Sequence, residues 1–235
     1  MAQKIIITRP QADAEILAKE MSAAGFESVI EPMLIIESIA IDLPSLSSFD
    51  GFVFTSANGV RSFSALSTVR DKPVFTVGEK TAYEAMQAGF DNVQSAGCDV
   101  SALAHYLEGK KGLYAHFRGQ DVTQSLVDLL EGVETIEIKE FIVYQAVKES
   151  QISTKALKYM GNNEVSHVLF YSKRTAKTFV ELLQNHECTS FVQGIKALCL
   201  ADSMVECLSV LPWKEIQVAQ HPDQESMLRL LKKNK

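Results

Sequence analysis

The chain has 235 residues, which is long for one domain and ordinary for two of about 110 to 120 residues each. Hydrophobic residues make up 46% of it and charged residues 22%, the balance of a globular protein with a buried core and not of a disordered one. The formal net charge is -6 and no long basic run occurs, so a nucleic acid is not an expected partner.

The sequence also argues against a secreted, membrane-bound or metal-dependent protein. No apolar stretch approaches the roughly 18 residues of a membrane span, and the three isoleucines after Lys4 predict a strand and not a signal peptide. The histidines lack metal-ligand spacing and no cofactor fingerprint occurs, so neither a metal nor a cofactor is predicted. Four cysteines without C-x-x-C or disulfide spacing are expected to be ordinary thiols of a cytoplasmic protein: Cys98, Cys188, Cys199 and Cys207.

Short apolar runs alternate with helical stretches along the chain, which predicts βαβ units and an α/β fold with parallel sheets. Strands are predicted at 5–7, 28–31, 52–54, 74–77, 93–95, 113–117, 135–138, 141–147, 168–170, 196–199 and 215–218. Helices are predicted between Pro10 and Gly25 and at 57–66, 79–88, 120–130, 173–184, 202–208 and 223–231. Two segments are typical of connectors, 37–48 and 145–153.

The chain contains an internal repeat. A Phe-x-Ser motif that ends at Ser56 recurs at an offset of 116 residues. A second match, at an offset of 109, pairs Arg9 with Arg118 and Glu31 with Glu140. Because half of the chain is about 117 residues, two related α/β halves fit its length.

Polar residues recur where the predicted strands end, and most of these places also open a helix: Thr8-Arg9, Thr55-Ser56, Lys80-Thr81, Arg118-Gly119, Tyr171-Ser172 and Asp202-Ser203. In an open parallel sheet, ligands bind outside the carboxyl ends of the strands, and the free N–H groups of a helix start favour anions. Two interpretations stay open at this point. The residues are ordinary helix caps, or together they form an anion-binding cleft.

Five short motifs, spread over nearly the whole chain, occur in a characteristic order: Ile-Thr-Arg-Pro at 7–10, Phe-Thr-Ser-Ala-Asn-Gly-Val at 54–60, Val-Gly-Glu-Lys-Thr-Ala at 77–82, Arg-Gly at 118–119 and Val-Tyr-Gln at 143–145. With these motifs the chain resembles the uroporphyrinogen-III synthase family. The C-terminal half departs from the family pattern at 171–174 and 201–205, and a second arginine usual after Arg118 is missing. These departures affect the expected substrate contacts more than the fold.

The resemblance implies two similar α/β domains with parallel sheets flanked by helices, joined by a two-stranded connector. One domain is expected to be discontinuous, with residues 1–37 and 144–235, and the other to be inserted as residues 38–143. The active site is expected between the domains. A monomer is expected, which meets the preceding enzyme of its pathway only transiently.

The activity implied by the resemblance is cyclisation of the linear tetrapyrrole hydroxymethylbilane without a cofactor, with loss of water and inversion of ring D, to give uroporphyrinogen III. Tyr144 matches the family's candidate proton donor. Helix starts, hydroxyls and cations at the strand ends would hold the eight substrate carboxylates. The residues expected to bind the substrate are Arg9, Thr55, Ser56, Lys80, Thr81, Arg118, Ser172 and Ser203.

A competing hypothesis is a non-catalytic two-domain protein of the same fold that binds an anion or a tetrapyrrole. The departures at 171–174 and 201–205 favour it, whereas the intact N-terminal motifs and Tyr144 disfavour it. Tyr144 itself has a structural alternative, as a tyrosine that only packs on a connecting strand.

Overall fold

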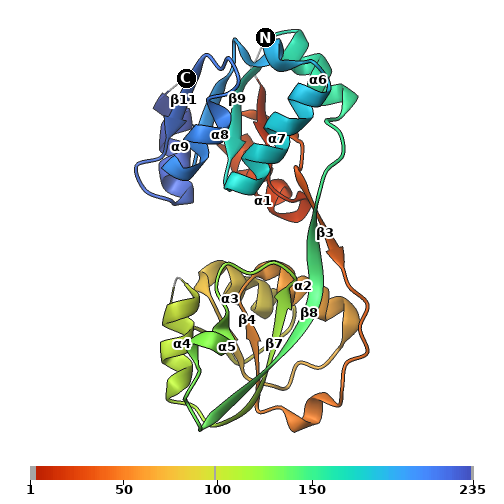
Figure 1. Ribbon diagram of the computed structural model, residues 1–235, viewed down its shortest axis with the longest axis vertical. Helices are drawn as coiled ribbons and strands as arrows, with labels where there is room; N and C mark the ends of the chain where they lie inside the picture. Colours follow the sequence, from red (N-terminus) through yellow and green to blue (C-terminus); the bar gives the residue numbers. More distant parts are fainter. Residues whose placement is uncertain (1–3, 98, 234–235) are drawn as a thin grey trace. The chain divides into compact units, whose positions relative to one another are not determined.

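The computed structural model describes residues 4–97 and 99–233, within which the chain forms two compact units. Unit 1 contains the described residues up to Ile35 and from Val147 onward, and unit 2 is Ile36–Ala146. In Figure 1, unit 1 is therefore drawn in red and in cyan to blue, and unit 2 in the colours between them. One unit is thus discontinuous, and the predicted α/β architecture with two strands connecting the units is confirmed.

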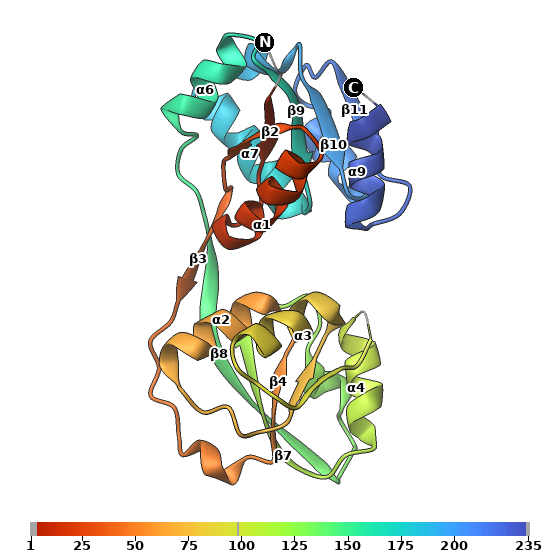
Figure 2. The same cartoon turned by 180° about the vertical axis from the view of Figure 1, so that it is seen from behind.

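Unit 1 has a parallel sheet in the order β11-β10-β9-β1-β2. Its strands are β1 (Lys4–Ile7), β2 (Glu27–Ile30), β9 (Val165–Phe170), β10 (Lys196–Cys199) and β11 (Glu215–Val218). Helices α1 (Gln11–Ala23) and α9 (Gln224–Lys233) cover one face, as Figure 2 shows. The other face is covered by α6 (Thr154–Gly161), α7 (Lys173–Asn185) and α8 (Val205–Leu208), with the short 3₁₀ helices η2 (Thr189–Val192) and η3 (Asp202–Met204) nearby in the chain.

Unit 2 has a six-stranded sheet in the order β3-β8-β7-β4-β5-β6. Its strands are β3 (Leu34–Ser38), β4 (Gly51–Phe54), β5 (Val74–Thr76), β6 (Val93–Ser95), β7 (Gly112–Gly119) and β8 (Ile136–Lys148). Helices α2 (Ala57–Leu66) and α3 (Gly78–Gln87) contribute to the core on one face, and α4 (Val100–Glu108) and α5 (Leu126–Leu129) to the core on the other. A 3₁₀ helix, η1 (Leu46–Ser48), precedes β4.

Five strands follow the same spatial order in the two sheets when β1, β2, β9, β10 and β11 are matched with β7, β8, β4, β5 and β6. The register agrees as well, because Ile7 lies opposite Leu169 and His116 lies opposite Val53, at the offsets of 109 and 116 found in the sequence. The match of Glu31 with Glu140 is shifted by one residue, since Ile30 is the residue opposite Ile7. The two units therefore share one architecture, built in a different chain order.

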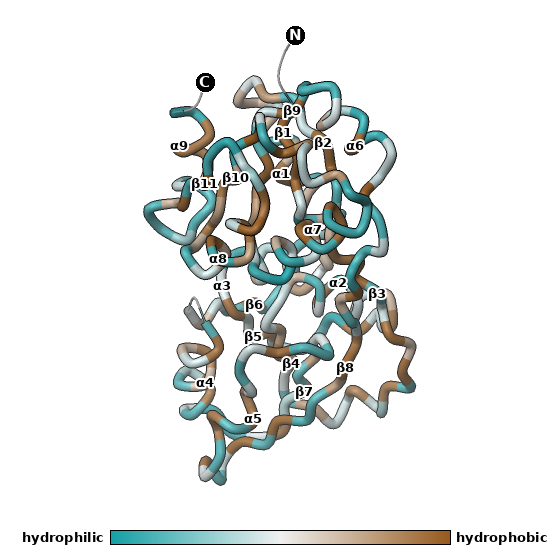
Figure 3. Tube along the Cα trace, turned by 45° about the horizontal axis from the view of Figure 1, so that its top comes forward, coloured by the Kyte–Doolittle hydropathy of each residue, from teal (hydrophilic) through white to brown (hydrophobic). Residues whose placement is uncertain are grey.

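Burial of both faces explains the sequence of the central strands. Ile5, Ile6 and Ile7 are fully buried because Ile6 enters the core on one side of the sheet and its two neighbours enter the core on the other. Figure 3 shows such hydrophobic runs in brown along strands of both units. No helix of the described chain is long and apolar enough to cross a bilayer.

The predicted helix at 120–130 is wrong, since α5 covers only Leu126–Leu129. The backbone N–H of Gln120 donates to the carbonyl of Tyr144, which prolongs the pairing of β7 with β8 by one residue, and residues 121–125 form bends and irregular backbone. A helix starts only after Ser125, whose hydroxyl accepts from the N–H of Asp128. The predicted strands at 135–138 and 141–147 form one strand, β8, and the elements β3, α4 and α6 were not indicated by the sequence.

The cysteine prediction is tested at three of its four positions. Cys188, Cys199 and Cys207 are free thiols, and Cys199 is buried. Burial raises the pKa of the Cys199 thiol to about 12, so it is an inert core residue. Cys98 and residues 1–3 of the N-terminal segment lie outside the described residues.

Candidate active site

Three chain segments place polar residues at the carboxyl edge of the unit 2 sheet. Ser56 lies two residues after the end of β4 and caps α2, because its hydroxyl accepts a hydrogen bond from the N–H of Gly59 at 3.1 Å. The helix lies close to β7, where a Cβ on Gly59 would come within 2.7 Å of the carbonyl oxygen of Phe117. Aromatic packing holds α2 in this position through Phe52, Phe54, Phe63, Phe90 and Phe117.

Tyr144 on β8 is joined to this edge by its hydroxyl, which lies 2.8 Å from the hydroxyl oxygen of Ser56. Its ring lies against Gly119 at the end of β7, where a Cβ would come within 2.6 Å of the ring carbon Cζ. Burial raises the pKa of Tyr144, an effect that the hydrogen bond with Ser56 partly offsets. The phenol is therefore protonated at neutral pH and sits beside the start of a helix.

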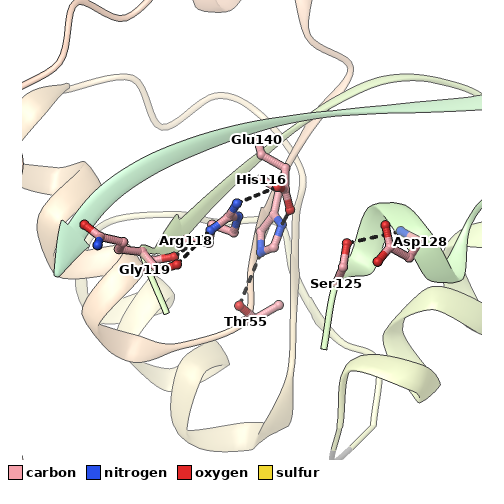
Figure 4. A network of polar contacts seen from close by, with 8 residues as sticks. Thr55, His116, Arg118, Gly119, Ser125, Asp128 and Glu140 are labelled. Atoms are coloured by element: carbon pink, nitrogen blue, oxygen red, sulfur yellow. Dashed lines mark hydrogen bonds and ion pairs between the residues drawn. The ribbon is translucent and has the colours of Figure 1, made fainter. Parts of the chain in front are cut away.

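A second polar network lies at the same edge, and Figure 4 shows its members. The ring of His116, on β7, lies between Thr55, whose Oγ1 is 3.2 Å from Nε2, and Glu140, whose Oε1 is 3.2 Å from Nδ1. The second carboxylate oxygen of Glu140 pairs with Arg118 at 2.8 Å. Hydrogen bonds from His116 and Arg118 lower the pKa of Glu140 to about 2, so it is a carboxylate at neutral pH.

Arg118 is tied to its own neighbours in this structure. Besides the pair with Glu140, its Nη1 donates to the carbonyl oxygens of Gly119 and Gln120, at 2.8 and 3.4 Å. Its guanidinium therefore lies at the predicted strand end, but it is balanced by a carboxylate of the same unit. A role in substrate binding stays a prediction for Arg118.

The other predicted site residues of unit 2 differ in exposure. Lys80 is exposed in the first turn of α3, whereas Thr81 is 6% exposed and belongs to the packed side of that helix. The turn before them is formed by Gly78, whose φ of +71° favours glycine.

In unit 1, Arg9 and Ser172 occupy matched strand ends. The hydroxyl of Ser172 accepts from the N–H of Thr175 at 3.1 Å and so caps α7 as Ser56 caps α2. Arg9 pairs with Asp13 at 3.0 Å, and its guanidinium carbon lies 4.6 Å from the ring centroid of Tyr171. Burial raises the pKa of Tyr171 to about 12. Ser203 is exposed in η3.

Within unit 2 the structure thus brings together Thr55, Ser56, Arg118 and Tyr144, all of which the sequence predicted as site residues. The sequence did not indicate His116 or the role of Glu140. Among the residues that the structure describes, no group of three or more His, Cys, Asp or Glu side chains could hold a metal ion.

A cavity of about 650 Å³ occurs elsewhere, beside α9 and β11 of unit 1. Its lining includes Val218, Arg229, Leu230 and Lys232, and it contains none of the predicted site residues. The chemistry of the strand ends, and not the size of this cavity, therefore defines the candidate site.

Comparisons with known proteins agree on one family. A family model described as uroporphyrinogen-III synthase HemD matches residues 15–229. A uroporphyrinogen-III synthase from Chlorobaculum parvum is 25% identical over 206 residues, which are 80% of this chain and 82% of that protein. A relative from Methanocaldococcus jannaschii is 36% identical over 86 residues, 34% of this chain and 35% of its own length. The crystal structure of uroporphyrinogen-III synthetase from Helicobacter pylori has the same fold, with a TM-score of 0.65 at 18% identity over 99% of this chain and 100% of that one.

Proposed function

The chain belongs to the uroporphyrinogen-III synthase family, and from this premise we propose that it cyclises hydroxymethylbilane to uroporphyrinogen III. In this reaction the hydroxyl of the ring A hydroxymethyl group leaves as water, ring D is inverted, and the macrocycle closes through the carbon that remains. Ring closure without an enzyme gives the uninverted isomer. The task of the protein is therefore to hold the bilane so that the substituted α-carbon of ring D attacks the ring A carbon that has lost its hydroxyl. This attack gives a spiro intermediate.

The observation that carries the proposal is the chain of hydrogen bonds from α2 through Ser56 to Tyr144. When the N–H of Gly59 donates to Ser56 and Ser56 donates to the Tyr144 oxygen, the phenol proton is free for the substrate. It passes to the hydroxymethyl oxygen while the pyrrole nitrogen of ring A supplies the electron pair that breaks the C–O bond. Ser56 and the helix start then stabilise the phenolate left on Tyr144.

The substrate carries eight carboxylates, which suits a site made of helix starts, hydroxyls and cations. Ser56 and Ser172 cap α2 and α7 in the same way, so each unit offers one such helix start. The residues that we propose as contacts for the substrate are Arg9, Thr55, Ser56, Lys80, Thr81, Arg118, Ser172 and Ser203. We propose a monomer of the cytoplasm that meets the preceding enzyme transiently, and sedimentation at 26.0 kDa would support the monomer.

An isomer-resolved assay with freshly generated hydroxymethylbilane tests the activity. Purified protein without added metal or nucleotide should give mainly the type III isomer, faster than the spontaneous reaction. Product that is only type I, formed at the spontaneous rate, contradicts the proposal.

The second candidate function is binding of an anion or tetrapyrrole without catalysis. It is favoured by Tyr171, which stands at the strand end of unit 1 that matches Thr55 in unit 2 and so removes the expected threonine hydroxyl there. Tight binding of a linear tetrapyrrole together with type I product alone would select this function.

A further inference from the structure

A buried histidine on β7 links two groups of the candidate site without any part in the proposed proton transfer. His116 is 2% exposed, and its two ring nitrogens contact Glu140 on one side and Thr55 on the other. Glu140 lies directly opposite His116 in the pairing of β7 with β8. The arrangement is a continuous path from Arg118 through Glu140 and His116 to the hydroxyl of Thr55.

The internal repeat shows that this architecture does not need such a path. By register, the opposed pair His116 and Glu140 corresponds to Ile7 and Ile30 in unit 1, and both isoleucines contribute to an apolar core. At the position of Thr55, unit 1 has Tyr171. Burying a polar network between neighbouring strands costs more folding free energy than burying an apolar pair there. Its presence in unit 2 therefore indicates a role other than stabilising the fold.

The direction of each hydrogen bond follows from the chemistry of the partners. Glu140 is ionised and can only accept, so Nδ1 of His116 carries a proton and donates it. Arg118 pairs with the second carboxylate oxygen of Glu140, so the charge of Glu140 is balanced without a charge on the imidazole. In the neutral tautomer that carries its proton on Nδ1, Nε2 has only a lone pair and accepts a hydrogen bond from the hydroxyl of Thr55. The oxygen of Thr55, which is half-buried, is left with lone pairs alone for a ligand.

We propose that Glu140 and His116 are positioning residues that fix Thr55 as a hydrogen-bond acceptor for a pyrrole N–H of the substrate. This inference rests on the proposed function, since a linear tetrapyrrole presents two kinds of polar group. Its carboxylates need donors and are repelled by an acceptor, whereas its pyrrole N–H groups need acceptors. Thr55 therefore recognises the backbone of the tetrapyrrole, while helix starts and cations at the same edge receive its carboxylates.

Glu140→Gln is the variant that tests the direction of the network. The amide can donate to Nδ1, which lets the imidazole carry its proton on Nε2 and turn the hydroxyl of Thr55 into an outward donor. We expect a rise in the KM for hydroxymethylbilane of about tenfold, the effect of one hydrogen bond that is lost in a site, with kcat nearly unchanged. A bilane that lacks the hydroxymethyl group and cannot react serves as the probe for direct measurement of Kd.

Because Glu140→Gln also weakens the ion pair with Arg118, a double-mutant cycle with Thr55→Val isolates the effect that passes through Thr55. Each single variant should weaken bilane binding about tenfold, and the double variant about as much as Thr55→Val alone. Thr55→Ser, which keeps the hydroxyl, should restore binding. Glu31→Gln is the matched control, because Glu31 is a buried carboxylate of unit 1 that accepts from Ser153 and has no contact with this network.

Additive losses in the double variant, or an equal loss in Glu31→Gln, overturn the proposal, because Glu140 would then act through general stability. A wild-type protein that does not bind the bilane overturns it as well. If the wild type gives only type I product but the binding cycle is non-additive, the proposed function fails while the acceptor role of Thr55 stands.

Discussion

The hydroxyl of Tyr144 is the atom on which the proposed chemistry depends. Tyr144→Phe keeps the ring that packs against Gly119 and removes only the group that contacts Ser56. Since general acids contribute about 10²–10⁴-fold, we expect kcat to fall by at least about tenfold, with bilane binding and Tm nearly unchanged. Steady-state kinetics with product isomer analysis measures this. Wild-type formation of the type III isomer by a well-folded variant would remove Tyr144 from the mechanism.

Arg9 is a cation whose present partners lie in its own unit. Arg9→Ala should weaken substrate binding by roughly 1–3 kcal/mol if the guanidinium meets a substrate carboxylate. It should also lower Tm slightly, because the contacts with Asp13 and Tyr171 are lost. The KM for hydroxymethylbilane and the thermal transition are measured together. An unchanged KM with a lowered Tm would assign Arg9 a structural role only.

From the burial of His167 we predict that the free energy of unfolding decreases at acidic pH. Its side chain is buried on β9, and burial, with Lys196 and Lys214 nearby, lowers its pKa to about 4. The unfolded chain binds this proton first, near its ordinary pKa of about 6.5. Stability from the neutral imidazole is therefore complete above pH about 6.5 and is lost as the pH falls from there to about 4.

Urea unfolding at several pH values tests this prediction by comparing the wild type with His167→Gln, which should lose the slope between these pH values. His105→Gln is the control for loss of an imidazole at the surface, since the side chain of His105 is 86% exposed. An equal pH dependence in the wild type and His167→Gln would contradict the assignment.

The contact of α2 with β7 is set by one glycine. A methyl group at Gly59 would meet the carbonyl oxygen of Phe117 at 2.7 Å, and backbone cannot move aside as a flexible side chain can. Gly59→Ala should therefore destabilise the protein by about 1–3 kcal/mol in urea unfolding. Gly109→Ala is the matched control, because Gly109 has φ -79° and its added Cβ meets nothing closer than 3.9 Å. Similar stabilities of the two variants would contradict the prediction.

Elements with a strong local pattern could be predicted from the sequence, and elements defined by their partners could not. The helix of Ala57–Leu66 has an apolar face and a serine cap, and it occurs as predicted. Strand β3 forms by pairing with β8, and Leu34–Ser38 shows no alternation of apolar and polar residues that would indicate a strand. The pairing of β7 with β8 also holds Gln120 out of the predicted helix, a tertiary effect that local propensity does not contain.

The candidate site divides in the same way. Thr55, Ser56 and Tyr144 follow from motifs and from their places at strand ends. His116 lies in a buried strand among apolar neighbours, where its only sequence signal was one polar residue between Ala115 and Phe117. Its meaning depends on the register that sets it opposite Glu140, and that register is a property of the folded sheet.

At the scale of the whole molecule, unit 1 is built from two separate segments of the chain and unit 2 from one. Unit 2 is continuous, whereas the sheet of unit 1 includes β1 as an interior strand beside β9 and β2 as an edge strand, both from the N-terminal segment of the chain. We predict that the inserted domain, residues 38–143, folds cooperatively when expressed alone. A fragment of residues 144–235 should stay unfolded until a fragment of residues 1–37 is added, because β9 otherwise lacks its partner β1.

Circular dichroism and urea unfolding are measured for fragment 38–143 alone, and for fragment 144–235 with and without fragment 1–37. A cooperative transition of 144–235 alone would contradict the prediction, as would an unfolded 38–143. The experiment also tests the domain boundaries that the resemblance implies.

The pairing of β1 with β9 sets the order in which the protein can fold during its synthesis. Lys4 lies opposite Val165, so the first strand leaves the ribosome about 160 residues before its neighbour. At 5–20 residues per second the interval is roughly 10–30 s, long enough for the whole of unit 2 to fold in between. Through this interval Ile5, Ile6 and Ile7 have only β2 and α1 to cover them. We therefore expect these isoleucines to stay partly uncovered in the nascent chain until β9 has been synthesised.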